Sequence, residues 1–238
     1  MVFDHRVIPS RWKWGRIGIG IRRGFLSERI PGLITSECAP CSGVDSNLDA
    51  RTLPFKDNSL RDIVMINVLR HLPYSRDFLR ESIHCLAIGG RIIMIEPWVT
   101  HWSRFIYNRL HYEPFDPGAP EWGFYSTGHL SGANSVQPWI IFQRDRRKFV
   151  QEFSELHLET IKLMMPFRYL ISGGVTSRNL LPGWMHSACR LMENMIIPWI
   201  DQTAMFAFIC RHSDQRRKGG NGGGKCQGNQ MPRIEPCH

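Results

Sequence analysis

The clearest hydrophobic pattern in the chain is a pair of short apolar runs that flank an amphipathic stretch. The runs at residues 63–68 and 92–95 are rich in β-branched side chains and too short for buried helices, so they predict buried strands at 62–67 and 91–96. Between them, residues 74–87 carry apolar side chains at helical spacing, and Gly89 follows, which predicts a helix that ends there. Two strands joined by such a helix favour a parallel pair with a crossover connection.

Weaker patterns extend this arrangement towards both ends of the chain. The whole order of elements predicts an α/β fold, a Rossmann-like, doubly wound and mostly parallel sheet that closes with a C-terminal antiparallel strand pair. The further strands are expected at residues 14–21, 33–37, 44–49, 156–164 and 204–210, and the further helices at 25–30, 102–110, 144–153 and, once or twice, within 177–200.

One long segment has no clear periodicity. Residues 111–138 hold four prolines and four glycines together with several aromatic side chains. A loop of this length inside a domain is usually functional, and its aromatic content argues against disorder. We expect either a substrate-side wall or a packed cover of the core. Around it we expect an irregular basic leader at 1–13, one domain at 14–211 and a disordered Gly-rich tail at 212–238.

The formal net charge of +9 is concentrated at the two ends of the chain. Residues 1–29 hold seven Lys or Arg against two acids, residues 211–238 hold six against two, and the remainder is balanced. The folded body therefore gives no indication of a nucleic-acid surface. No apolar run approaches the length of a transmembrane segment.

The number and spacing of the cysteines indicate the redox state of the cellular compartment and whether a metal site is expected. Seven cysteines at irregular spacing do not suggest a disulfide framework, so a reducing, cytoplasmic location fits better. Cys38 and Cys41 form one isolated pair, without the second pair of ligands that a zinc site needs. We therefore expect no metal.

The central segment carries a more specific signal than any single motif. It reads LPFKDNSLRDIVMINVLRHLP, continues through a helix to Gly89-Gly90, and ends with a strand that closes on Glu96-Pro97. In order and spacing these pieces resemble the middle of class I S-adenosylmethionine-dependent methyltransferases, in particular the methyltransferase type 11-like domain. In weaker form, the resemblance continues to about Arg211 and is closest to a bacterial subgroup, which does not indicate an acceptor.

The resemblance implies S-adenosylmethionine as the cofactor and a set of residues that would hold it. Glu37, at the end of a predicted strand, matches the acid that accepts both ribose hydroxyls. Asp49, followed by Ala50, matches the contact to the adenine amine, and Asn67 lies where the family lines the methionine end. Each polar residue also has a structural alternative, namely a turn-capping acid, an Asx turn and a strand-end cap, respectively.

The family's first motif, an acid followed by spaced glycines, is only partly matched. Gly18, Gly20 and Gly24 are its nearest counterparts, but Arg16 stands in place of the acid and two further arginines enter the loop. We expect these cations to repel the sulfonium, which predicts weak binding of S-adenosylmethionine relative to neutral S-adenosylhomocysteine. The alternative is a Gly-rich basic leader that binds no ligand.

The expected reaction is methyl transfer to a small-molecule or cell-envelope sugar or lipid acceptor, by in-line attack on the sulfonium methyl. The protein would mainly supply alignment and desolvation, with a base only for a hydroxyl acceptor. His71, His101 and His111 are candidate bases, none of them assigned, and Glu96 could meet the substrate or cap the helix at 102–110.

Two other classes of protein stay open. One is a non-catalytic remnant or binding subunit with a damaged glycine motif. The other is an NAD-dependent oxidoreductase, which is disfavoured because the glycine segment is no clean dinucleotide fingerprint.

Overall fold

The computed structural model describes residues 15–22, 25–111, 113–124, 132–171 and 185–214. The strands are β1 (Gly15–Ile19), β2 (Leu33–Glu37), β3 (Ser46–Asn47), β4 (Leu60–Ile66), β5 (Leu86–Pro97), β6 (Leu156–Met164) and β7 (Phe206–Ser213). The helices are α1 (Phe25–Arg29), α2 (Ser75–Cys85), α3 (His101–Leu110), α4 (Gln137–Trp139), α5 (Arg146–Glu152), α6 (Arg168–Ile171), α7 (Met185–Ile196) and α8 (Ile200–Thr203). Two 3-10 helices, η1 (Leu69–His71) and η3 (Ile197–Trp199), and one π-helix, η2 (Ile140–Arg144), complete the described helices.

All seven strands belong to one sheet in the order β3-β2-β1-β4-β5-β7-β6. The first five strands run parallel, and β7 lies antiparallel between β5 and β6. The predicted fold class is therefore confirmed, including the antiparallel pair near the C-terminus. The segment that carried the strongest sequence signal forms β4, α2 and β5 at the centre of the molecule.

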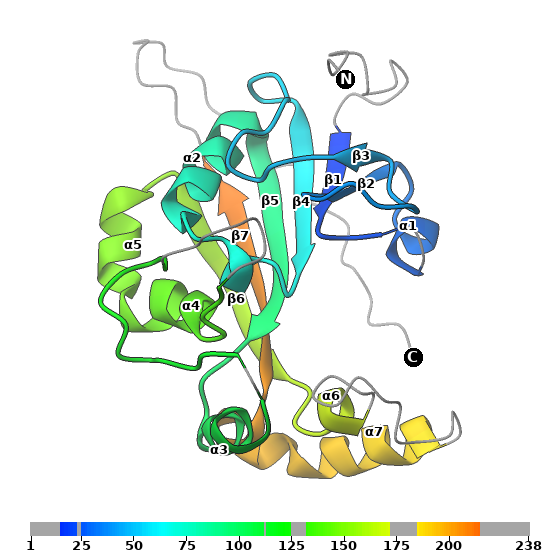
Figure 1. Ribbon diagram of the computed structural model, residues 1–238, viewed down its shortest axis with the longest axis vertical. Coiled ribbons are helices and arrows are strands. Elements are labelled where there is room, and N and C mark those ends of the chain that lie inside the picture. The colour runs from blue at the N-terminus through cyan, green and yellow to red at the C-terminus, as the bar shows by residue number, and fades with distance from the viewer. Residues whose placement is uncertain (1–14, 23–24, 112, 125–131, 172–184, 215–238) are drawn as a thin grey trace, which may run out of the picture.

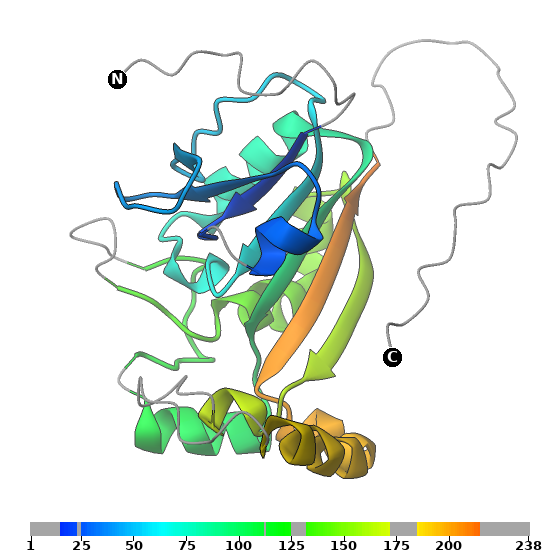
Figure 2. The same ribbon diagram turned by 90° about the vertical axis from the view of Figure 1, so that its right-hand side faces the viewer.

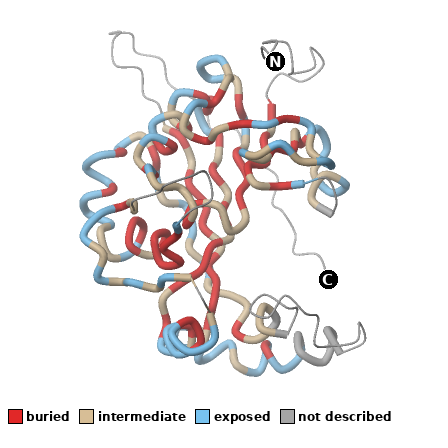
Figure 3. The backbone as a smooth tube through the Cα atoms, viewed as in Figure 1, coloured by how far each residue is buried: buried red, intermediate tan, exposed pale blue. Residues whose placement is uncertain are grey.

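Helices cover both faces of this sheet. Figure 2 shows α1 in front of the strands, with α2 and the green helices behind them. The central strands are the most deeply buried part of the chain (Figure 3), and Ile63, Met65 and Ile92 are wholly inaccessible. Phe78 and Leu79 close the core from α2, as the helical periodicity predicts. None of the described helices is long and apolar enough to cross a bilayer.

The boundaries differ from prediction where contacts distant in sequence decide them. Leu86 and Ala87 fit the apolar face of a helix, but α2 ends at Cys85 and β5 begins at once, because Leu86 is extended and pairs with Leu60. A Cβ on Gly90 would lie 2.8 Å from the carbonyl oxygen of Ala87, so the tight path into β5 requires glycine. The helices α4, η2 and α6 were not predicted, and β7 begins and ends later than the expected strand at 204–210.

Candidate functional site

Strands β1 and β4 are neighbours in the sheet, and the order in which the chain adds strands reverses between them. The chain leaves β1 towards β2 and β3 on one side, and leaves β4 towards β5 on the other. In open α/β sheets, ligands bind outside the carboxyl ends of the strands at this reversal. The residues that follow β1, β2 and β4 therefore define the candidate site.

The glycines that the structure describes in the first motif have a packing explanation. Gly20 follows β1 with a φ of 65°, in the left-handed region, and a Cβ there would overlap Cγ2 of Val68. Glycine at this position lets the turn after β1 approach the turn after β4. At Gly18 a Cβ would lie 3.1 Å from the side chain of Ile21. Their contact with a cofactor stays a prediction, and Gly24 lies outside the described residues.

Arg16 does not stand where the motif comparison placed it. It is the second residue of β1, at the amino end of the strand and level with Asp62 of β4. Its Nε donates to the Asp62 carboxylate at 2.9 Å, and Nη1 donates to the carbonyl of Pro31. The expectation that Arg16 repels the sulfonium is therefore wrong. The guanidinium is neutralised by Asp62 near the amino ends of β1 and β4, whereas the candidate site lies at the carboxyl ends of the strands.

Glu37 lies at the candidate edge, as the last residue of β2. Its carboxylate keeps about a quarter of its exposure, and the Nε of Arg22 lies 3.8 Å from Oε1. The bridge between Ile21 and Ser36 brings Arg22 to this end of β2. Since Arg22 is two-thirds exposed, the ion pair is weak and a ligand hydroxyl could replace it.

Asp49 has more partners than the sequence suggests. Its carboxylate accepts the backbone N–H of Arg51 at 2.9 Å, which is an Asx turn, and also the Arg51 guanidinium at 2.6 Å. Ala50 is buried. The structural alternative for Asp49 is thus present, and a contact with adenine would have to share the carboxylate with Arg51.

Asn67 directly follows β4 and adopts a φ of 58°, which is unusual for a residue with a side chain. Its backbone N–H donates to the carbonyl of Ile95 at 3.0 Å, so the turn is tied to the end of β5. The side-chain Oδ1 is buried without a hydrogen-bond partner among the described residues. A buried acceptor without a donor is costly, and a bound ligand would relieve that cost.

Glu96 organises the same turn from the neighbouring strand. It is wholly buried, and Oε1 accepts the backbone N–H groups of Val68 and Leu69, both at 2.8 Å. Oε2 has no partner among the described residues, and burial raises the pKa of the carboxyl to about 7. Helix α3 is capped by Thr100, so of the two alternatives given for Glu96, the cap of that helix is wrong.

A second polar cluster lies beside this turn and was not predicted. Arg70, largely buried, pairs with the carboxylate of Glu113, which also accepts the hydroxyl of Ser135 at 3.1 Å. The backbone N–H of Glu113 donates to Nδ1 of His111 at 3.2 Å. Arg70 and Glu113 are 43 residues apart, so no local pattern could have revealed the pair.

The three candidate histidines occupy different environments. Burial lowers the pKa of His71. Its hydrogen bond with the backbone of Gly132 supports a structural role for this side chain. Burial also lowers the pKa of His111, whereas His101 is exposed as the first residue of α3. None of the three is assigned as a base.

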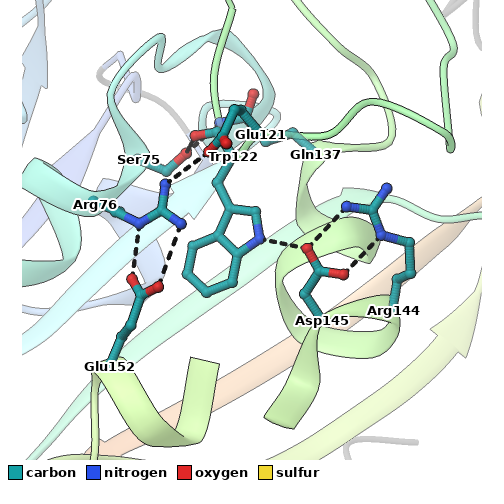
Figure 4. A network of polar contacts seen from close by, with 8 residues as sticks. All are labelled: Ser75, Arg76, Glu121, Trp122, Gln137, Arg144, Asp145 and Glu152. Atoms are coloured by element: carbon teal, nitrogen blue, oxygen red, sulfur yellow. Dashed lines mark hydrogen bonds and ion pairs between the residues drawn. The ribbon is translucent and has the colours of Figure 1, made fainter. Parts of the chain in front are cut away.

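Trp122 and Phe115, from the aromatic segment after α3, pack with the core. Figure 4 shows the indole of Trp122 between Arg76 and Asp145. Its N–H donates to the Asp145 carboxylate at 2.8 Å, and the Arg76 guanidinium lies 4.5 Å from the ring centroid. Phe115 stacks on Tyr107. These two aromatics form a packed cover.

Metal binding has weak support in the described part of the chain. Glu81, His84 and Cys85 lie close enough together to share an ion, but His84 Nε2 is 2.6 Å from the exposed carboxylate of Asp57. Burial raises the pKa of Cys85 to about 12, so its thiol is protonated. A hollow lined by basic residues of α5 lies elsewhere, and none of the predicted cofactor residues lines it.

Comparison with known proteins adds fold similarity alone. No protein-family model and no curated protein matches the chain. Among solved structures, geranyl diphosphate C-methyltransferase from Streptomyces coelicolor A3(2), determined with geranyl diphosphate and S-adenosyl-L-homocysteine, is 13% identical, with a TM-score of 0.47 over 84% of this chain and 75% of that one.

Two further structures are similar to the same degree. An S-adenosylmethionine-dependent methyltransferase from Mesorhizobium loti is 10% identical, with a TM-score of 0.44 over 86% of this chain and 93% of that one. The YcgJ protein from Bacillus subtilis is 13% identical, with a TM-score of 0.47 over 89% and 96%. Two of these three are methyltransferases by name, as the central segment predicts, but at such low similarity the likeness carries no argument about function.

Proposed function

We propose that the chain binds S-adenosylmethionine at the carboxyl edge of its sheet and transfers the methyl group to a small-molecule or cell-envelope acceptor. One observation carries the proposal. Gly20 and Asn67 directly follow β1 and β4, and Glu37 is the last residue of β2. These are the three adjacent strands at the reversal of strand order. By the resemblance, Glu37 would contact the ribose of S-adenosylmethionine, and the glycine turn and Asn67 would lie at its methionine end.

The chemistry of the three positions suits the parts of the cofactor. A carboxylate such as Glu37 accepts two neighbouring ribose hydroxyls through charge-assisted hydrogen bonds. The unpartnered Oδ1 of Asn67 is an acceptor for the ammonium group of the methionine portion. Methyl transfer then needs alignment of the acceptor with the sulfonium carbon and exclusion of water, and it requires no covalent enzyme intermediate.

Glu37→Ala tests the ribose contact. The variant should bind S-adenosylmethionine about 10–150-fold more weakly, because a hydrogen-bonded charge is worth about 1.5–3 kcal/mol. Titration calorimetry of both proteins gives the ratio. Asp57→Ala is the matched control, since it removes the same charge from a 77% exposed side chain just before β4, at the other edge of the sheet. Equal affinities for Glu37→Ala and the unmodified chain would remove Glu37 from the site.

Arg22, rather than Arg16, is the described cation that lies beside Glu37. Arg22→Ala should tighten S-adenosylmethionine by about two- to fivefold, because exposed ion pairs contribute up to about 1 kcal/mol. The gain should be smaller for S-adenosylhomocysteine, whose sulfur is neutral. Arg61→Ala controls for the lost charge, since Arg61 is also exposed but lies at the start of β4. A gain that is the same for both ligands would show that Arg22 affects only Glu37.

A binding subunit without catalysis is the second candidate function. It is favoured by the engagement of Asp49 with Arg51 and by the structural role of His71. Such a protein would bind the cofactor with the same dependence on Glu37 but would not release S-adenosylhomocysteine in the presence of acceptors. Measurement of S-adenosylhomocysteine production therefore separates the two.

A further inference from the structure

A helical layer covers the end of the molecule beyond the carboxyl ends of the central strands. It consists of α3, α6, α7, η3 and α8, which lie together at the bottom of both Figure 1 and Figure 2. Helix α3 packs against α8, and α6 against α7. The layer joins the sheet directly, because α3 follows β5 and α8 precedes β7.

The exposed surface of this layer is unusually apolar. Ten large hydrophobic side chains of the described residues are exposed, and seven of them belong to the layer, whereas the other three are scattered. The seven are Phe105, Leu110, Leu191, Met192, Met195, Ile197 and Trp199. We call them the apolar face. Single exposed hydrophobic residues are ordinary, but a gathered set marks an interaction site.

The orientation of α7 strengthens this interpretation. Its acid, Glu193, is buried, and Oε1 accepts the backbone N–H of Phe167 at 3.1 Å. Leu191, Met192 and Met195 are instead more than half exposed. Burying an acid while three apolar residues of the same helix are exposed is the reverse of the usual pattern of a surface helix in water. The exposed side of α7 therefore suits an apolar medium.

The charges around the apolar face indicate what kind of surface it contacts. Among the described side chains of the layer, the exposed ionised groups are Arg104, Arg109 and Asp201, so cations prevail. The guanidinium of Arg109 lies 5.2 Å from the ring centroid of Phe105, directly on the apolar face. A second copy of the chain would add the same excess of cations across the interface. Cations beside exposed apolar residues and a tryptophan instead match anionic lipid headgroups above acyl chains.

We propose that the apolar face docks on the surface of a membrane that contains anionic lipids. Leu191, Met195 and Trp199 enter the boundary between headgroups and acyl chains, and Arg104 and Arg109 contact the phosphates. In this arrangement the described helices lie on the surface of the bilayer. The proposal goes beyond methyl transfer and does not depend on it. A lipid-borne acceptor would reach the carboxyl edge of the sheet from this side.

Met195→Glu in the full chain tests the docking. Met195 is 72% exposed, so the variant should keep its thermal midpoint. Its partition onto vesicles of phosphatidylcholine and phosphatidylglycerol, measured by co-sedimentation, should fall at least about tenfold, because one apolar side chain leaves the bilayer. Ile88→Glu is the matched control, since Ile88 is 66% exposed near the start of β5, away from the layer.

The control also separates the contribution of the apolar face to vesicle binding from that of the basic chain ends, because both variants have the same chain ends. Arg104→Gln and Arg109→Gln should each lower the preference for anionic over pure phosphatidylcholine vesicles, by about fivefold. Equal binding by Met195→Glu and Ile88→Glu would overturn the proposal. So would a dimer in solution that Met195→Glu dissociates while the unmodified chain ignores vesicles, since the occupant would then be a second copy.

Discussion

Replacing Trp122 with alanine is expected to lower the free energy of unfolding by about 3–5 kcal/mol. The side chain is 1% exposed and packs near Phe149 and Phe153, with its N–H on Asp145. The substitution leaves a large cavity and removes the donor to a charged acceptor. For a chain of this size, the midpoint of thermal unfolding should fall by roughly 10 °C.

The same substitution at Trp199 provides the control. That indole is 57% exposed, so Trp199→Ala should change the free energy of unfolding by less than about 1 kcal/mol. Urea unfolding of the three proteins gives the comparison. If Trp122→Ala were as mild as Trp199→Ala, the segment 113–124 would not be anchored to α2 and α5 in the way that Figure 4 shows.

Glu96 should make the stability of the protein depend on pH. Burial raises the pKa of this carboxyl from 4.5 to about 7 in the folded chain, a change worth about 3 kcal/mol. The folded state therefore binds the proton more tightly than the unfolded state. The stability that protonation of Glu96 gives the folded state is complete below about pH 4.5 and is lost as the pH rises through about 7.

Glu96→Gln removes this titration and keeps an acceptor for the N–H groups of Val68 and Leu69. Between pH 5 and pH 8, the free energy of unfolding of the unmodified chain should fall by about 2–3 kcal/mol relative to the variant. Urea unfolding at both pH values measures the change. Glu121→Gln, at a 70% exposed side chain, controls for the loss of one acid. Parallel profiles for the unmodified chain and Glu96→Gln would contradict the account.

The central βαβ unit was predictable because its information is local. The apolar runs of β4 and β5 and the helical spacing of Phe78 and Leu79 need only neighbouring residues. The boundary between α2 and β5 was not, since Leu86 fits a helix until its pairing with Leu60 is known. The expected antiparallel pair, β6 and β7, was likewise found with shifted ends.

The candidate site was predictable as far as a strand end fixes the position of a residue. Glu37 and Asn67 are at the edge because they terminate recognisable strands. The partners of Arg16 and Glu96 were not predictable, because Asp62 is 46 residues from Arg16, and Val68 is 28 residues from Glu96. Such pairs depend on strand register, which sequence patterns do not specify.

The aromatic segment illustrates the same limit. Its composition suggested either a substrate wall or a packed cover, and only the contact of Trp122 with Asp145, 23 residues away, decides for packing at that residue. The pairing of Arg70 with Glu113 was not predictable for the same reason, because the two residues are 43 positions apart.

Titration calorimetry of the unmodified full chain with S-adenosylmethionine tests the central claim most directly. The account predicts a saturable one-to-one heat, with a dissociation constant weaker than about 1 μM because Arg22 competes for Glu37. NAD should give no saturable heat under the same conditions. The absence of saturable binding at millimolar S-adenosylmethionine, or tighter binding of NAD, would contradict the proposal that this edge of the sheet is a methyl-donor site.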